Sequence, residues 1–312
     1  MPDDVVPLAH DMDATVRLLR AAVAVRPWIG DRAPELAERL AAAVRAGTTR
    51  GALYLSDGRP VGIATWEPHG PVGAGVGLWY LEAPHATVEQ YRRFYAGIGS
   101  VAGAIAFVQG DLPGLSPDDE GRLLAELGLA RFGRSEMCRR DEHPLGELRL
   151  PAGGSLRPVG PADAADLIRL HTAAYHGTFD RYLFIEHEDE AEDGAKLLAD
   201  LFGGRWGPYE TAGSWGLEVD GRLVGVVLSV ARPEGVLIAD VAVDPALQGQ
   251  GIGRAVMVGT LRALDAAGRG PVYLNVTEGN AKAIRLYEGL GFVRTLGPSR
   301  EWYNPRQVPA AP

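Results

Sequence analysis

Three glycines alternate with other residues in the run Gln248-Gly249-Gln250-Gly251-Ile252-Gly253. The segment before the run, Val236 to Val243, is apolar and of strand length, and the pattern after it predicts an amphipathic helix. Glycines let a backbone pass close to a ligand, and a helix N-terminus adds about half a positive charge. The sequence therefore predicts a pyrophosphate-binding loop that needs no lysine.

Two other phosphate-binding loops do not fit this spacing. A Rossmann site needs G-x-G-x-x-G/A directly after its strand, whereas residues 244–247 separate strand and glycines here, and Val256 stands where the third glycine would be. A P-loop needs Gly-Lys-Ser/Thr, which the run lacks. A glycine-rich turn that only permits tight packing is the alternative that the loop alone leaves open.

Two longer runs resemble the signatures of one family. Val241 to Gly253 resembles motif A of the GNAT N-acyltransferase superfamily, Q/R-x-x-G-x-G/A. Asn280 to Phe292 resembles that superfamily's second signature, N-x-x-A-x-x-L-Y-x-x-x-G-F, and a predicted strand, Val272 to Val276, lies between them. The length and two-part layout are similar to those of the mycothiol synthases, which acetylate a cysteinyl amino sugar.

The resemblance implies an acyl-CoA donor site and direct transfer of an acetyl or other short acyl group to a primary amine of a small molecule. In the superfamily, the strand before the loop splays from its neighbour at a bulge, its free backbone groups bind the pantetheine arm, and the loop amides hold the pyrophosphate. The resemblance implies no metal ion. The donor-binding positions carried over are Val241, Ala242, Val243, Gln248, Gly249, Gln250, Gly251, Ile252, Gly253, Arg254, Asn275, Asn280 and Tyr287.

Tyr287 matches the residue that commonly protonates the departing thiolate in this superfamily. A thiol has an ordinary pKa of about 8.5, so its thiolate can take a proton from a phenol placed beside it. The alternative is a core residue, because Ile284, Tyr287 and Leu290 form an apolar helical stripe.

The general base departs from the related pattern. The similar ribosomal-protein alanine acetyltransferases use a glutamate twelve residues before the tyrosine, and this chain has Asn275 there, which cannot accept a proton. Asp240, beside the expected bulge, is the predicted base. Glu278 and a chain of water molecules are the alternatives.

Polar and aromatic side chains gather between His171 and Tyr182. The first helices of this superfamily precede its core, so this stretch is expected to shape the acceptor pocket, with plain surface packing as the alternative. The spacing of His171, His176 and Asp180 fits no standard metal site.

The chain is predicted to consist of two tandem GNAT-like domains, residues 1–145 and 154–312, joined by breaker residues at 151–155. Each is expected to be an α/β (mixed α+β) domain with a mostly antiparallel central sheet flanked by helices. The repeat shows at the closing segments, where Arg122 to Leu129 aligns with Arg285 to Phe292.

The first half is predicted to lack a donor site. Aligning Pro84 with Pro245 places the bulky run Thr87 to Arg92, which contains Glu89, where the second half has glycines. Leu124 stands in the place of Tyr287. Supporting the sheet, forming a pocket wall or making a homodimer contact are the roles left open for this half.

The composition of the chain limits which classes of function and which cellular location are expected. The net charge of −9 disfavours nucleic-acid binding through a basic surface, and no apolar run is long enough to cross a membrane. A single cysteine, Cys138, and an acidic N-terminus fit a cytoplasmic protein without a secretory signal. A non-catalytic acyl-CoA-binding regulator is the alternative from another class, and Tyr287 beside an intact loop argues against it.

Overall fold

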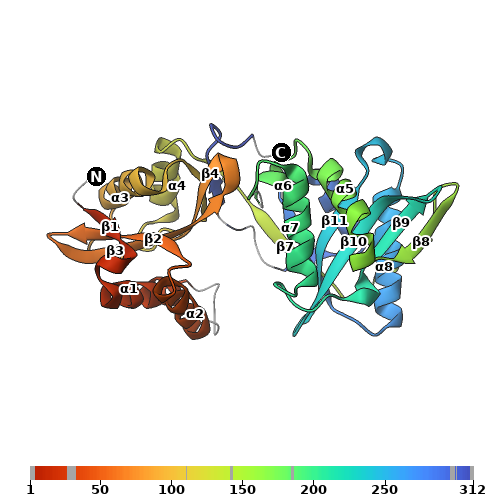
Figure 1. Cartoon of the computed structure of the whole chain (residues 1–312), viewed down its shortest axis with the longest axis horizontal. Coiled ribbons are helices and arrows are strands. Elements are labelled where there is room, and N and C mark those ends of the chain that lie inside the picture. The colour runs from red at the N-terminus through yellow and green to blue at the C-terminus, as the bar shows by residue number, and fades with distance from the viewer. Residues whose placement is uncertain are drawn as a thin grey trace. The chain divides into compact units, whose positions relative to one another are not determined.

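The computed structural model describes residues 4–26, 33–109, 111–140, 143–183, 186–295, 299 and 301–309 (Figure 1). The chain divides into two compact units. Unit 1 comprises Met1–Phe132 with Arg300–Ala310, and unit 2 comprises Gly133–Ser299 with Ala311–Pro312.

Unit 1 contains four α-helices and one mixed sheet among its described residues. Its helices are α1 (Met12–Ala24), α2 (Ala33–Arg45), α3 (Val88–Ala102) and α4 (Pro117–Glu126). Its strands are β1 (Val5–Pro7), β2 (Arg50–Ser56), β3 (Arg59–His69), β4 (Gly73–Leu81), β5 (Ile105–Gln109), β6 (Ala130–Phe132) and β14 (Glu301–Tyr303).

Unit 2 repeats the plan. Its helices are α5 (Ala164–Tyr175), α6 (Phe179–Tyr182), α7 (Glu190–Phe202), α8 (Ile252–Ala266) and α9 (Ala281–Glu288). Its strands are β7 (Arg134–Arg139), β8 (Gly154–Pro158), β9 (Trp215–Val219), β10 (Arg222–Arg232), β11 (Gly235–Val243), β12 (Val272–Thr277) and β13 (Val293–Arg294).

The two sheets have the same topology. Their strand orders are β1-β2-β3-β4-β5-β14-β6 and β8-β9-β10-β11-β12-β7-β13. The described pairs are antiparallel except β4 with β5 and β11 with β12, which are parallel. The predicted fold, two tandem domains with mostly antiparallel sheets flanked by helices, is confirmed.

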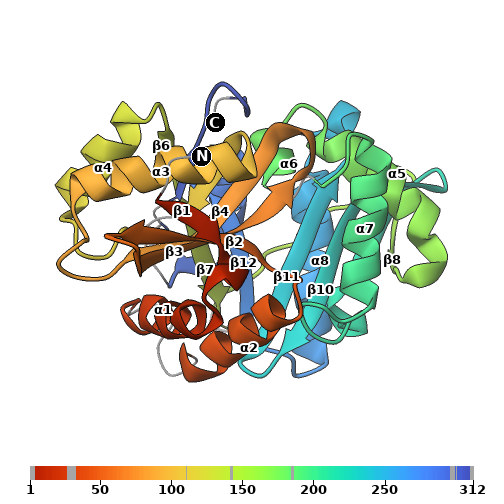
Figure 2. The same ribbon diagram turned by 60° about the vertical axis from the view of Figure 1, so that its left-hand side comes forward.

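Helices cover both faces of each sheet (Figure 2). In unit 1, α1 and α2 pack on one face and α3 and α4 on the other. In unit 2, α5 and α7 pack on one face, and α8 and α9 pack on the other. Each sheet therefore has an apolar layer on both of its faces, where the apolar side chains of its strands are buried against helices.

The sixth strand of each sheet comes from the other half of the chain. β7 pairs with β12 and β13 in unit 2, and β14 pairs with β5 and β6 in unit 1. Buried Arg139 on β7 also pairs with Asp265 of α8 at 3.2 Å. The two halves have thus exchanged one strand each.

This division differs from the predicted domains 1–145 and 154–312, which would assign β7 to the first half and β14 to the second. Only Gly133 lies between β6 and β7. Common hairpins need at least two loop residues, so β7 cannot fold back beside β6 and continues into the next unit. The short strands β1, β13 and β14 and the one-turn helix α6 are too brief to leave a periodic pattern, and the sequence did not predict them.

A bulge in β11 decides which way its side chains point. Leu228 of β10 pairs with Asp240 and Ser229 pairs with Ile238, so Ala239 is the extra residue. Leu237 and Ala242 therefore lie in the same apolar layer under α5 and α7, although an odd spacing separates them. The bulge places Asp240 on that face instead of in the layer under α8.

None of the helices in the described part of the chain has both the length and the apolar composition needed to cross a bilayer.

Candidate active site

Strands β11 and β12 separate as they run toward the glycine loop. They pair only from Val236–Ile238 to Val272–Leu274, and β11 continues to Val243 with no described ladder to β12. The Asp244 amide donates to the Val224 carbonyl at 2.9 Å. Because backbone groups alternate along an antiparallel pair, the amides and carbonyls of Val241 and Val243 point away from β10, into the gap.

The glycine loop is open on its outer side. Gly249 and Gly251 have φ of 79° and 84°, and a Cβ built at either position would meet no protein atom within 4 Å. Gly251 is the N-cap of α8, without a capping side chain, so the first helical amides lack the usual internal acceptor. This backbone can approach an anion closely, as a pyrophosphate site requires.

The other predicted loop residues have mixed surroundings. Ile252 is buried in the core, whereas Gln248 and Gln250 are exposed. The Arg254 guanidinium donates to the Gly289 carbonyl at 3.3 Å, at the end of α9. At Gly253 a Cβ would make ordinary contacts of 3.5 and 3.6 Å, so alanine fits this position.

Tyr287 lies on α9 and packs against Phe292 with ring centroids 5.9 Å apart. Burial, together with the carboxylates of Asp240 and Asp180, raises the pKa of Tyr287 above its ordinary value. Its hydroxyl forms no hydrogen bond with a described residue, and its oxygen is not completely buried. Tyr287 is thus both a core residue through its ring and a neutral phenol open to the site, which combines the two interpretations of its sequence pattern.

Asp240 is the most heavily bonded carboxylate of the site. It is 4% exposed, and it accepts from the Tyr175 hydroxyl at 2.8 Å and contacts His171 Nδ1 at 3.1 Å. Burial alone would raise the pKa of Asp240, but these partners and the Val241 amide outweigh burial and leave the pKa below its usual value. Asp240 is therefore an anion at the bulge, beside the end of the gap.

A second carboxylate lies nearby. Asp180, on α6, accepts a hydrogen bond from the Thr277 hydroxyl at the end of β12, and its charge contributes to the raised pKa values of Tyr175 and Tyr287. Two carboxylates and two phenols thus surround the end of the gap between β11 and β12. Such a site can bind a cationic amine and pass protons.

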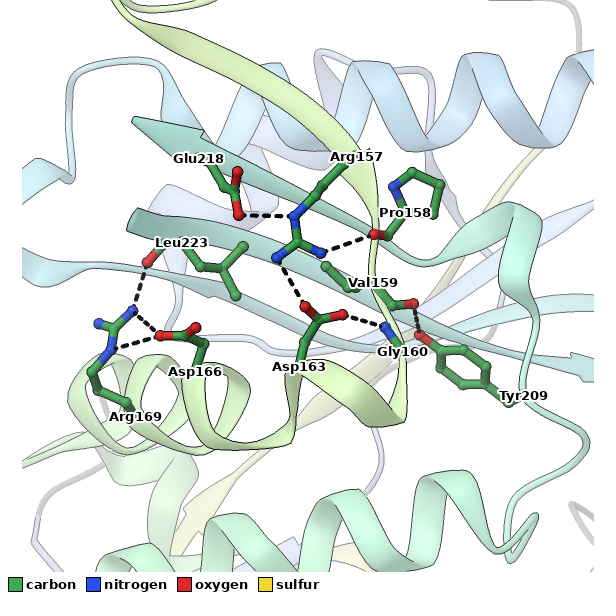
Figure 3. A network of polar contacts seen from close by, with 10 residues as sticks. All are labelled: Arg157, Pro158, Val159, Gly160, Asp163, Asp166, Arg169, Tyr209, Glu218 and Leu223. Carbon is green, nitrogen blue, oxygen red and sulfur yellow. Dashed lines mark hydrogen bonds and ion pairs between the residues drawn. The ribbon is translucent and has the colours of Figure 1, made fainter. Parts of the chain in front are cut away.

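The position of α5, which carries His171 and Tyr175, is fixed by polar contacts at its start (Figure 3). Arg157 of β8 binds Asp163, one residue before α5, and Glu218 of β9, each at 2.8 Å. Farther along the helix, Arg169 donates to the Leu223 carbonyl of β10 at 2.9 Å. These contacts hold α5 against the sheet and so determine which side chains reach β11.

Two residues predicted to bind the donor, and the alternative general base, have surroundings that the sequence did not indicate. Asn280 is the N-cap of α9, and its side chain accepts from the Ala283 amide at 3.1 Å. Asn275 is exposed on β12. Glu278, the alternative base, binds Ser135 of β7 and Arg294 of β13, and these contacts hold its pKa below the usual value. Because β7 and β13 lie on the far side of β12 from β11, Glu278 faces away from the site.

The sequence placed His171 in an acceptor-shaping stretch but did not connect it to Asp240. His171 and Tyr175 are four residues apart on one helix, a spacing that puts both side chains on one face. That spacing was the available signal. It becomes informative only once the bulge is known to turn Asp240 toward the same helix.

This chain is similar in sequence to known acetyltransferases. The profile described as "Acetyltransferase (GNAT) family" matches residues 166–292. A mycothiol acetyltransferase of Thermomonospora curvata is 31% identical over 272 residues, covering 85% of this chain and 86% of the relative. Another, from Thermobispora bispora, is 31% identical over 311 residues, covering 91% and 93%.

Solved structures agree on the fold. A tandem GNAT protein from the clavulanic acid biosynthesis pathway has a TM-score of 0.58 at 18% identity, covering 96% of this chain and 97% of that one. A GCN5-related N-acetyltransferase from Sphaerobacter thermophilus has a TM-score of 0.56 at 19% identity, covering 97% and 95%. Matched in both sequence and fold, the chain belongs to the GNAT family of acetyltransferases and is an N-acyltransferase.

Proposed function

We propose that unit 2 transfers an acetyl group from acetyl-CoA to a primary amine of a small molecule, and that unit 1 binds no donor. The observation that carries the proposal is the coincidence of three features at one place. The gap between β11 and β12, the open glycine loop and the Tyr287 hydroxyl all belong to the same end of one sheet.

The backbone would hold the donor. The Val241 carbonyl and the Val243 amide and carbonyl suit an extended pantetheine arm, which would add to the strand edge, and the amides from Gly249 to Arg254 suit the pyrophosphate. Tyr287 then lies where the thioester sulfur would arrive and donates its proton to that sulfur as the C–S bond breaks. Its raised pKa matters less there, because the same burial raises the pKa of a thiol.

The base side of the reaction is the network around Asp240. An amine reaches the site as an ammonium ion, which must lose a proton before its nitrogen can attack the acyl carbon. Asp240 and Asp180 provide the negative charge that attracts this cation. The acceptor class that we would test first is a cysteinyl amino sugar, because two relatives that align with most of this chain are named mycothiol acetyltransferases.

Side chains of unit 1 itself support the absence of a donor site there. β4 and β5 separate after Val76 as β11 and β12 do, but the Tyr91 hydroxyl accepts from the Leu81 amide at 3.2 Å. Buried Arg26 donates to the Trp79 carbonyl at 3.1 Å. By the register of the two sheets, Leu81 and Trp79 correspond to Val243 and Val241, so the groups free in unit 2 are already bonded in unit 1.

The loop of unit 1 is also shorter. Six residues, 82–87, join β4 to α3, whereas eight, 244–251, join β11 to α8. The Thr87 side chain caps α3 by accepting from the Gln90 amide at 3.3 Å, which uses a group that an anion would need.

Incubation of the full chain with acetyl-CoA and a panel of amines, read by mass spectrometry of the acetylated product, tests the proposal. We expect product from at least one amine, a cysteinyl amino sugar among them, and one acetyl-CoA bound per chain by calorimetry. Binding of acetyl-CoA without transfer to any amine would indicate a regulator instead, and two bound molecules per chain would refute the assignment for unit 1.

A further inference from the structure

Asp240 is poorly arranged to take a proton itself. One oxygen accepts from the Tyr175 hydroxyl at 2.8 Å and the other faces His171 Nδ1 at 3.1 Å, with the Val241 amide as a further donor. Its side chain is 3% exposed. A buried carboxylate with this many donors is stabilised as the anion, and protonation would break at least one of these bonds.

His171 has the opposite arrangement. Because an ionised carboxylate can only accept, the contact with Asp240 assigns the proton to Nδ1 and leaves a lone pair on Nε2. Nε2 forms no hydrogen bond with a described residue. This atom is not completely buried, and the side chain is 18% exposed. The Tyr175 ring, 4.4 Å away between centroids, supports the imidazole from one side.

We infer that His171 Nε2 is the atom that accepts the proton from the acceptor ammonium, and that Asp240 is a positioning residue that holds the imidazole. This inference rests on the proposed amine acetylation. The nitrogen loses two protons overall as the C–N bond forms and the C–S bond breaks. His171 passes the first to solvent, and the second replaces the proton that Tyr287 gives to the sulfur.

The other ionisable groups packed around this ring are engaged elsewhere. On α7, the small residue Gly194 lies against the ring edge, with 3.6 Å between a Cβ built there and His171 Cδ2. Asp193, next to Gly194, forms an ion pair with His187, and Glu190, one turn earlier on α7, forms one with Arg181. Of the other ionisable groups that face His171 and its partners, Tyr175 donates a hydrogen bond to Asp240, and Asp180 accepts one from Thr277. Tyr287 is the remaining group.

The test compares His171→Ala and Asp240→Asn in the full chain, with His10→Ala, an exposed histidine of unit 1, as the matched control. We expect His171→Ala to lower kcat about 100-fold or more, to abolish the acidic limb of the pH–rate profile, and to recover activity when imidazole is added. Asp240→Asn should slow the enzyme yet keep the acidic limb, because the imidazole remains. His10→Ala should match wild type.

Acetyl-CoA affinity by calorimetry and the melting temperature of each variant separate lost chemistry from lost folding. Loss of the acidic limb in Asp240→Asn, with the limb retained in His171→Ala, would make Asp240 the base and overturn the inference. So would a near-normal rate, or no imidazole rescue, in a folded His171→Ala that binds acetyl-CoA. Failure of wild type to acetylate any amine concerns the proposed function instead and is read before any variant is compared.

Discussion

Replacing Tyr287 by phenylalanine removes one hydroxyl and keeps the ring. The ring packs with Phe292 and with the layer under α8 and α9, and all of these contacts remain in the variant. The hydroxyl donates to no described residue, so its loss leaves no buried group unpaired. We therefore expect the free energy of unfolding to change by less than about 0.5 kcal/mol, and the affinity for acetyl-CoA to stay at the wild-type value.

The chemistry should respond differently. The hydroxyl is proposed to act only as the C–S bond breaks, so its removal raises the barrier without affecting the ground state. Loss of a general acid lowers kcat by roughly 10² to 10⁴, which corresponds to about 3 to 5 kcal/mol at 1.36 kcal/mol per factor of ten. This barrier change exceeds the expected stability change several-fold, so the two effects can be separated.

Steady-state kinetics over pH, with calorimetry for the donor, measures both. Burial and two carboxylates raise the pKa of Tyr287, so in wild type its hydroxyl stays protonated up to the ordinary tyrosine value of about 10 and contributes no basic limb below it. A higher KM with unchanged kcat would show that the hydroxyl only anchors the donor. Unchanged kcat and KM would refute the acid role and leave Tyr287 as a packing residue.

Three further changes test the rest of the site and fold. Gly251→Glu should abolish acetyl-CoA binding in calorimetry by placing charge at the loop, whereas Gly268→Glu, at the other end of α8 and also at positive φ, should not. Met137→Ala on β7 should destabilise unit 2 by about 2–5 kcal/mol, with hydrogen exchange rising in β12 and α8 but not in β2–β4. Arg26→Met should cost unit 1 about 1–3 kcal/mol in denaturant unfolding, because the Trp79 carbonyl loses its donor, and it should create no second acetyl-CoA site.

Each of these has a clear contrary result. Equal loss of acetyl-CoA binding in the Gly251 and Gly268 variants would show that backbone strain, and not the charge, is responsible. Faster exchange in β2–β4 after the Met137 change would place β7 in the first sheet. A second molecule of acetyl-CoA bound to the Arg26 variant would mean that the side chain blocks a site that is otherwise intact.

Part of the secondary structure follows from local signals in the sequence. Residues 190–202 have a helix-forming composition and form α7, and two hairpins turn at Asp57 and Asp220, both at positive φ, as their Asp-Gly pairs indicate. These elements follow from residues close together in the chain. Local signals of the same kind identified the glycine loop, because its backbone conformation depends on glycines that can be read directly from the sequence.

The exchange of β7 and β14 could not be predicted in that way. A strand pattern states which face of a strand is buried but not which sheet it joins, and pairing with β5 or β12 depends on contacts more than a hundred residues apart. The single connecting residue, Gly133, becomes meaningful only once the ends of both strands are known.

The sequence by itself determined the donor side that we propose, namely the loop at Gly249 and Gly251 and the phenol of Tyr287, because each depends on a short contiguous run. Only the tertiary structure decided the base side of the proposed reaction. Asp240 meets His171 across 69 residues of chain, and it does so because a one-residue bulge at Ala239 turns it toward α5. A bulge arises from pairing with a neighbouring strand, so no pattern within β11 alone could reveal it.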